Sequence, residues 1–135
     1  MVVVDSSAWI EFLRGTGSPV HLTLRRMLAE NAELATTEVV VMEVLAGARD
    51  EAHRSALRER LLAFPVLALR GLADYEAAAE LYRSCRSRGA TVRRLVDCLI
   101  AIPSIRAGAS VLHADRDFDQ IARCAPLRIE ALGST

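Results

Sequence analysis

Short apolar runs alternate along this chain with longer stretches in which apolar positions recur every three or four residues. Short runs bounded by turn residues are typical of buried strands, whereas the longer periodic stretches are typical of amphipathic helices. This pattern predicts strands at residues 2–5, 33–36, 65–69, 110–113 and 127–130. It predicts helices at residues 8–14, 20–30, 37–49, 50–62, 72–88, 93–107 and 118–123.

Strands that alternate with helices favour an α/β fold with a mainly parallel sheet, flanked by helices on both faces. We therefore expect one sheet of about five short strands. Three consecutive valines at 39–41 would also suit a strand, which is the alternative for that segment. The chain has 135 residues and no repeat, linker or low-complexity tract, so we predict a single domain over residues 1–135.

The absence of lysine, rather than the net charge, excludes some classes of protein. The formal net charge is zero, so overall charge predicts no partner. All 17 basic residues are arginines, for which codon usage in a GC-rich genome is the simplest explanation. The absence of lysine argues against receiver domains and aspartate-nucleophile phosphatases, two classes that also gather acids at strand ends but use a lysine.

Cysteine usage and hydropathy indicate the cellular setting. Cys85, Cys98 and Cys124 are an odd number without C-x-x-C spacing, which fits reduced thiols better than disulfides or a zinc site. The N-terminal residues lack the pattern of a secretory signal, and no uncharged apolar stretch is long enough to span a bilayer. We expect a cytoplasmic protein that makes no contact with a membrane.

Four carboxylates interrupt or follow the apolar runs: Asp5, Glu43, Asp97 and Asp115. An ionised carboxylate in apolar surroundings is costly unless it is paired, protonated or bound to a cation. Two of the four follow predicted strand ends, and the other two lie in the early turns of helices that begin at the same edge of the sheet. Their convergence predicts an acidic pocket for Mg²⁺ or Mn²⁺, which prefer carboxylate oxygens.

Each acid taken alone also has a structural explanation. Asp5 could cap the first helix, and Asp97 could be a first-turn acid favoured by the helix dipole. Glu43 could lie on a narrow exposed stripe of its helix. Asp115 could be a turn residue, with Asp117 capping the helix that follows.

Four segments match, in order and spacing, the motifs of a known family. They are residues 3–10 with Asp5, residues 37–47 with Glu43, residues 97–101 with Asp97, and residues 113–122 with Asp115. The chain resembles the PIN-domain ribonucleases, in particular the VapC-type toxins of bacterial toxin–antitoxin pairs, over essentially its whole length. The resemblance implies a metal-dependent endoribonuclease whose products carry a 5′-phosphate and a 3′-hydroxyl. The alternatives are a non-catalytic interaction module with this fold and, as a poorer match, a structure-specific DNA nuclease.

The resemblance also implies a role for each matched acid. Asp5 and Asp97 would bind the metal directly, and Asp115 would bind it directly or through water. Glu43 would orient or deprotonate the attacking water.

Three further residues complete the expectations for the site. The resemblance implies that Ser7 holds Asp5 by a hydrogen bond and that Asp117 supports the acids. Pro103 departs from the family pattern, because it removes the amide that would bond to the carbonyl of Leu99. The helix carrying the third acid is therefore expected to bend or stop near Pro103, with the acid itself left in place.

Arginines near the acidic edge are the candidates for contact with RNA: Arg93, Arg94 and Arg116. A solvated surface position is the alternative for each of them. The resemblance further implies a homodimer and a VapB-type antitoxin. A groove for an antitoxin peptide could form between residues 9–13 and the 50–62 helix, with core packing as the alternative for Trp9. An antitoxin arginine inserted among the carboxylates would then block the metal site.

Overall fold

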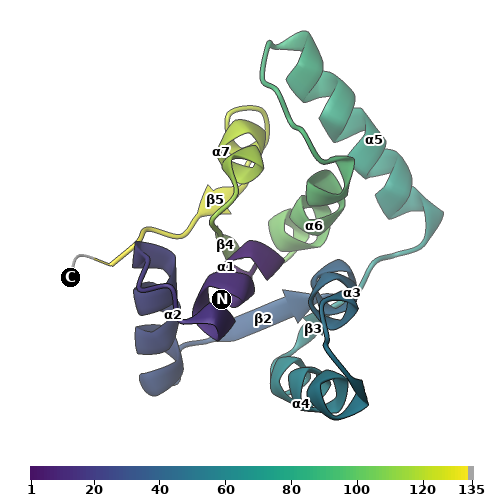
Figure 1. Ribbon diagram of the computed structural model, residues 1–135. Coiled ribbons are helices and arrows are strands. Elements are labelled where there is room, and N and C mark those ends of the chain that lie inside the picture. Colours follow the sequence, from purple (N-terminus) through teal and green to yellow (C-terminus); the bar gives the residue numbers. More distant parts are fainter. Residues whose placement is uncertain (134–135) are drawn as a thin grey trace.

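The computed structural model describes residues 1–133 of the protein as an α/β fold (Figure 1). The elements follow in the order β1 (Val2–Val4), α1 (Ser6–Arg14), α2 (Pro19–Ala29), β2 (Leu34–Thr37), α3 (Glu38–Ala46), α4 (Glu51–Leu61), β3 (Val66–Leu67), α5 (Leu72–Ser87), α6 (Leu95–Arg106), β4 (Ser110–Leu112), α7 (Arg116–Ala122) and β5 (Arg128–Ile129). The predicted alternation of short strands and helices is thereby confirmed. Within the described residues, none of the helices has the length and apolar character needed to cross a membrane.

The five strands form one sheet in the order β3-β2-β1-β4-β5, and every neighbouring pair is parallel. The expectation of a mainly parallel sheet is confirmed. The central strands β1 and β4 pair with Val4 opposite Leu112, and both of these side chains are fully buried. The chain builds one half of the sheet from β1 to β3 and then returns to the other side of β1 for β4. Such a switch between neighbouring strands opens a crevice at their carboxyl ends, where ligands bind in open α/β sheets.

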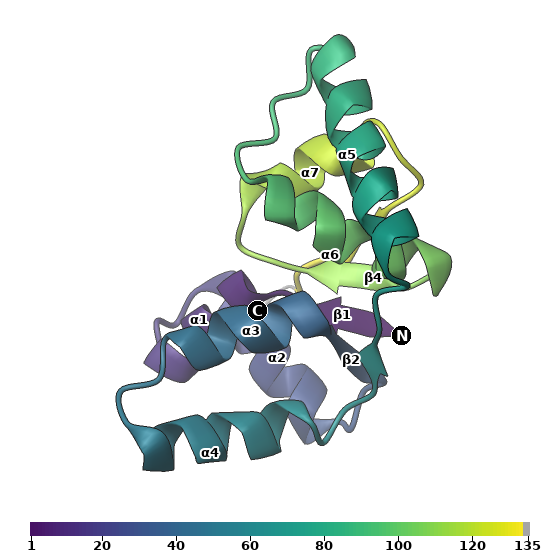
Figure 2. The same ribbon diagram turned by 90° about the vertical axis from the view of Figure 1, so that its right-hand side faces the viewer.

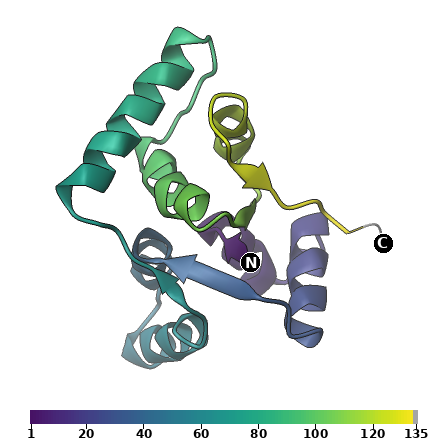
Figure 3. The ribbon, with the colours of Figure 1, turned by 180° about the vertical axis from the view of Figure 1, so that it is seen from behind.

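The helices divide into two groups about the central strands. Figures 1, 2 and 3 show α5, α6 and α7 on the side of β4 and β5, and α2 and α4 on the side of β2 and β3. Helices α5 and α6 share the most extensive helix–helix contact, and α3 contacts α6 across the boundary between the two groups. The carboxyl ends of β1 and β4 lie at this boundary, so residues from both groups can meet there.

Helix α3 shows why the three valines at 39–41 do not form a strand. Thr37 accepts a hydrogen bond from the amide of Val40 through its hydroxyl, which caps the helix at its first turn. Val39 and Val40 are buried against the core. Tertiary burial and the cap therefore outweigh the strand preference of β-branched residues, and the strand alternative is wrong.

The helices begin within two residues of their predicted starts, and two of these differences affect the acids. Helix α7 begins at Arg116 rather than Phe118, because Oδ1 of Asp115 accepts the amide of Asp117 at 2.9 Å and so caps the helix. The alternative in which Asp117 is the cap is thus wrong. Helix α6 begins at Leu95, so Arg94 lies at its N-cap and Asp97 in its first turn.

Pro103 does not end helix α6, contrary to the expectation that the helix could stop there. The helix continues to Arg106, and the amide of Ala107 still donates to the carbonyl of Pro103 at 3.1 Å. The proline ring is buried. Packing therefore holds a residue that removes one backbone hydrogen bond from the helix interior.

Candidate active site

Asp5 leaves the end of β1 and caps α1 at the crevice. Its Oδ2 atom accepts hydrogen bonds from the amide and the hydroxyl of Ser7 at 3.0 and 2.5 Å. Its Oδ1 atom is buried and has no hydrogen-bond donor in the described residues 1–133. Burial raises the pKa of Asp5 although the Ser7 hydrogen bonds oppose the rise, and the charge on Glu43 raises it further.

Asp97 is buried without a hydrogen-bond donor to either of its carboxyl oxygens within the described residues. Burial, followed by the neighbouring carboxyl groups of Asp117 and Asp115, raises the pKa of Asp97 to about 9. The charge on Asp5 adds to this shift, which places Asp5 close to the same group. Without a cation, Asp97 therefore carries a proton at neutral pH.

Asp117 ties the start of α7 to the start of α6. Its Oδ1 and Oδ2 atoms accept the backbone amides of Arg93 and Arg94 at 2.9 and 2.8 Å. Burial opposes its ionisation, but these two amides hold the pKa of Asp117 below its ordinary value. The ionised form of Asp117 is therefore favoured next to Asp97. The sequence indicated support for the acids by Asp117 but not this link to α6.

Asp97, Asp115 and Asp117 each place one oxygen within 4.8 Å of the other two. This spacing suits a shared cation, because carboxylate oxygens around Mg²⁺ or Mn²⁺ lie about 2.0–2.2 Å from the ion. The family resemblance implies Asp5 and Asp97 as direct ligands, whereas the group of acids with oxygens within 4.8 Å consists of Asp97, Asp115 and Asp117. Asp5 is not a member of this group, but its charge raises the pKa of Asp97.

Glu43 reaches the crevice from α3 and is held at both carboxylate oxygens. Ser6 donates a hydrogen bond from its hydroxyl to Oε1 at 2.9 Å, and the guanidinium of Arg94 pairs with Oε2. The side chain keeps a small exposed fraction of 16%, so solvent can reach it. Ser6 was missed in the sequence, because a serine in the first turn of a helix has too many ordinary roles to be singled out.

Arg94 lies among the acids rather than on a free surface. Its Nη1 atom is 3.8 Å from Oδ2 of Asp115 and 3.9 Å from Oδ1 of Asp97, in addition to the pair with Glu43. The other two arginine candidates, Arg93 and Arg116, are exposed at the starts of α6 and α7. Of the three, Arg94 is the one whose guanidinium lies within 4 Å of the acids among the described residues.

The acids fit a divalent cation on the chemistry of their oxygens. Three buried carboxyl oxygens, one on Asp5 and two on Asp97, lack donors in the part of the chain that the structure describes. Buried polar atoms are nearly always satisfied, so such oxygens require a proton or a cation. The ligand set contains only carboxylates, which favours Mg²⁺ or Mn²⁺ over a metal that prefers sulfur or imidazole.

Comparisons with known proteins show the family of the chain. Residues 2–123 match the family model described as PIN domain. The chain is 43% identical to Ribonuclease VapC11 of Mycobacterium tuberculosis over 129 residues, which cover 95% of this chain and 96% of that protein. Its fold is similar to a toxin–antitoxin complex from Klebsiella pneumoniae, with a TM-score of 0.70 and 18% identity over 96% of this chain and 100% of the matched one. It is also similar to Mycobacterium tuberculosis VapC20, a sarcin–ricin loop cleaving toxin, with a TM-score of 0.66 and 18% identity over 95% of this chain and 99% of that one.

Proposed function

The chain belongs to the PIN domain family, and from this premise we propose that it is a toxin endoribonuclease neutralised by a cognate antitoxin. The observation that carries the proposal is the set of buried carboxyl oxygens on Asp5 and Asp97 at the switch point of the sheet. The similarity to Ribonuclease VapC11 over nearly the whole chain supports RNA as the substrate class. The similarity in fold to a toxin–antitoxin complex agrees with the second part of the proposal.

We propose Mg²⁺ or Mn²⁺ as the cofactor, held by Asp5 and Asp97 with Asp115 in direct or water-mediated contact. A bound divalent cation lowers the pKa of a coordinated water and neutralises charge on a phosphodiester. The backbone amides of Arg93 and Arg94 stabilise the ionised carboxylate of Asp117 beside the proposed metal position. A negative charge there favours a divalent cation over a monovalent one.

Glu43 is proposed to orient the attacking water and accept its proton. The Ser6 hydroxyl fixes one carboxylate oxygen, and the guanidinium of Arg94 pairs with the other. A general base needs this positioning as well as access to water. Attack of water on phosphorus with cleavage of the P–O3′ bond would leave a 5′-phosphate on one RNA fragment and a 3′-hydroxyl on the other.

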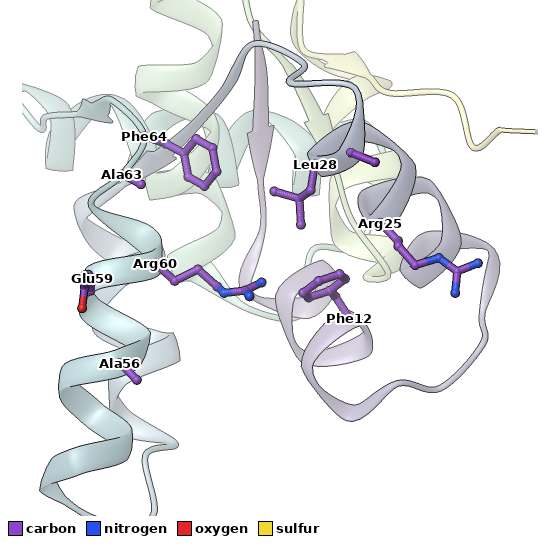
Figure 4. A pocket seen from close by; sticks show the side chains of 9 residues that line it. Phe12, Arg25, Leu28, Ala56, Glu59, Arg60, Ala63 and Phe64 are labelled. Atoms are coloured by element: carbon purple, nitrogen blue, oxygen red, sulfur yellow. The ribbon is translucent and has the colours of Figure 1, made fainter.

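A groove between α1, α2 and α4 is the proposed binding site for an antitoxin segment (Figure 4). It has a volume of about 740 Å³, and its apolar lining includes Phe12, Leu28 and Phe64. Arg60 extends over the ring of Phe12 with its guanidinium carbon 5.2 Å from the ring centroid, and Arg25 also borders the opening. An apolar segment with acidic flanks matches this lining.

Trp9 belongs to the core beneath this groove and does not line it. Its side chain is 1% exposed and packs against Phe12 and Phe64 at ring-centroid distances of 6.0 and 6.3 Å. Of the two explanations left open by the sequence, core packing is therefore the correct one for Trp9.

An antitoxin arginine entering the acidic crevice remains part of the proposal. Retention of full Mg²⁺ binding and RNA cleavage in the antitoxin complex would contradict it.

A homodimer is proposed from the apolar side chains that α3 and α5 leave exposed. Met42, Leu72 and Tyr75 are 59%, 72% and 53% exposed, and an interface between two copies that covers them would remove this apolar surface from water. Replacing Leu72 with Glu should shift the sedimentation coefficient of the protein toward that of a monomer. An unchanged coefficient would exclude this face.

Cleavage of a panel of RNAs with and without Mg²⁺ or Mn²⁺ tests the main proposal against a non-catalytic interaction module. Activity should require the cation and disappear in Asp5→Asn and Asp97→Asn. Cleavage that persists in both variants would point to a contaminating nuclease. Cleavage that is absent from the wild-type protein under all metal conditions would favour the interaction module.

A further inference from the structure

The position of Arg94 is unusual because a cationic side chain occupies a crevice that also suits a metal ion. Its guanidinium pairs with Glu43 and lies 3.8 and 3.9 Å from the carboxylates of Asp115 and Asp97. Three acids from three different elements thus face one arginine of the same chain. In the metal-free protein this guanidinium partly balances the negative charge of Glu43 and Asp115.

The balance is incomplete at the most buried acid. The distance of 3.9 Å to Asp97 is beyond a hydrogen bond, and both carboxyl oxygens of Asp97 lack a donor within residues 1–133. Arg94 therefore satisfies Glu43, which is 16% exposed, and leaves the buried oxygens of Asp97 unsatisfied. A divalent cation would bind these oxygens, which the guanidinium does not reach.

The backbone of Arg94 is fixed, whereas its side chain has room to move. The amide donates to Asp117 and the carbonyl accepts the amide of Asp97 at 3.0 Å, so the origin of the side chain is set. The side chain is 46% exposed, so it can turn outward without disturbing the core. The guanidinium of arginine keeps its charge at every physiological pH. Its interaction with the acids can therefore end by movement but not by loss of a proton.

We propose that Arg94 is a displaceable counter-ion of the active site. Its guanidinium stabilises the acidic crevice of the metal-free protein, and binding of the divalent cation drives it outward because the two positive charges compete for the same carboxylates. This inference rests on the proposed function, which supplies the cation. The displaced guanidinium then lies at the rim of the crevice, next to the position of an RNA phosphate.

Titration of the full-length metal-free protein with Mn²⁺, followed by calorimetry, tests the inference without RNA or catalysis. Arg94→Met should bind Mn²⁺ about three- to tenfold more tightly than the wild type, the range expected on removal of a half-exposed competing ion pair. Arg93→Met is the matched control, because it removes the same charge from the adjacent residue, whose side chain is exposed. Its affinity should change about twofold at most, since a solvent-exposed charge is largely screened.

Thermal unfolding gives a second measurement on the same samples. Arg94→Met should lower the melting temperature of the metal-free protein, and saturating Mn²⁺ should remove most of the difference from the wild type. Arg94→Gln should behave in the same way, which guards against a packing defect peculiar to methionine. Arg93→Met should melt as the wild type does in both conditions.

The outcomes separate the inference from the proposed function. Equal or weaker Mn²⁺ binding by Arg94→Met, or an equal gain in Arg93→Met, overturns the role of Arg94 even if the wild type binds Mn²⁺. A wild type whose Mn²⁺ binding is absent, or is unaffected by Asp97→Asn, overturns the proposed metal site and the inference with it.

Discussion

Ser7 donates a hydrogen bond of 2.5 Å from its hydroxyl to Oδ2 of Asp5, the acid at the end of the central strand. The same hydroxyl accepts the amide of Ala114 at 2.9 Å, so one side chain connects the end of β1 to the segment after β4. The ionised form of Asp5 is stabilised by this bond although the group is buried. The hydroxyl therefore contributes both to the fold and to the charge of the site.

Replacing Ser7 with Ala should destabilise the protein by about 1–2 kcal/mol, because a buried acceptor and a backbone amide both lose a partner. It should also weaken Mn²⁺ binding, since Asp5 becomes harder to ionise. Chemical denaturation and calorimetry measure the two effects. Ser87→Ala is the control, because Ser87 bonds only to the carbonyl of Ser84 at the exposed end of α5. If Ser7→Ala binds Mn²⁺ with wild-type affinity, the Ser7 hydroxyl does not contribute to metal binding by stabilising ionised Asp5.

Glu43→Gln should reduce the rate of RNA cleavage by about 10²- to 10⁴-fold, the range typical of a lost general base. Mn²⁺ affinity should fall far less, because the variant keeps Asp97 and the acids of α7. Single-turnover cleavage and calorimetry on the same preparation separate the two. Glu38→Gln is the matched control, because Glu38 begins the same helix but binds the amide of Leu69 outside the crevice. Equal losses in the two variants would point to a general defect of α3.

Metal binding should release protons near neutral pH. Burial and the neighbouring carboxyl groups raise the pKa of Asp97 to about 9, whereas a bound cation requires the ionised form. Mn²⁺ affinity should therefore strengthen as the pH rises toward 9, and calorimetry in buffers of different ionisation enthalpy should detect the released proton. Asp97→Asn should abolish the release. Identical binding enthalpies in all buffers would contradict the protonated state of Asp97.

The same shift gives the stability of the metal-free protein a definite dependence on pH. Between the ordinary value of 3.8 and about 9, the folded protein holds a proton on Asp97 that the unfolded chain has lost. The contribution of this group to the free energy of unfolding therefore falls as the pH rises through that window. Urea denaturation in the presence of a chelator should show the fall, and Asp97→Asn should flatten it. A stability that rises steadily from pH 5 to 9 in the wild type but not in Asp97→Asn would refute the sign.

Arg93 and Arg94 should contribute to RNA binding through phosphate contacts. In the cleavage-deficient Asp97→Asn background, Arg93→Ala should weaken binding and reduce the slope of log K against log salt by about 0.7, the value for one contact with a single strand. For Arg94→Ala we expect the same change. It is measured separately, in protein that keeps Asp97 and with a non-cleavable RNA. Fluorescence anisotropy supplies both slopes. Arg58→Ala, on the exposed face of α4, is the control. Unchanged slopes for both would remove these arginines from the path of the RNA.

Pro103→Ala should stabilise the protein. Proline inside a helix costs about 3 kcal/mol relative to alanine, whereas the buried methylene groups lost in the change contribute about 0.8 kcal/mol each. The balance favours alanine by about 1–2 kcal/mol, and the melting temperature should rise accordingly. A lower melting temperature would show that packing of the proline ring outweighs the missing backbone hydrogen bond.

The sequence was sufficient for the α/β fold because its strands are short, apolar and separated by helices with recognisable ends. It was less informative where one residue has several possible partners. Asp115 and Asp117 both suit a helix cap, and only the coordinates show that Asp115 caps α7 while Asp117 accepts two amides from the start of α6. The pair between Arg94 and Glu43 joins residues 51 positions apart, a separation at which charge pattern alone predicts nothing.

The carboxylates come from segments that begin at residue 5 and end at residue 117 of a chain of 135. The last of them follow β4, which must insert beside β1 before Asp115 and Asp117 can approach Asp97. A nascent chain that has left the ribosome only as far as α5 therefore lacks Asp97, Asp115 and Asp117. If the protein acts on RNA as proposed, that activity starts only after β4 and the start of α7 have left the ribosome.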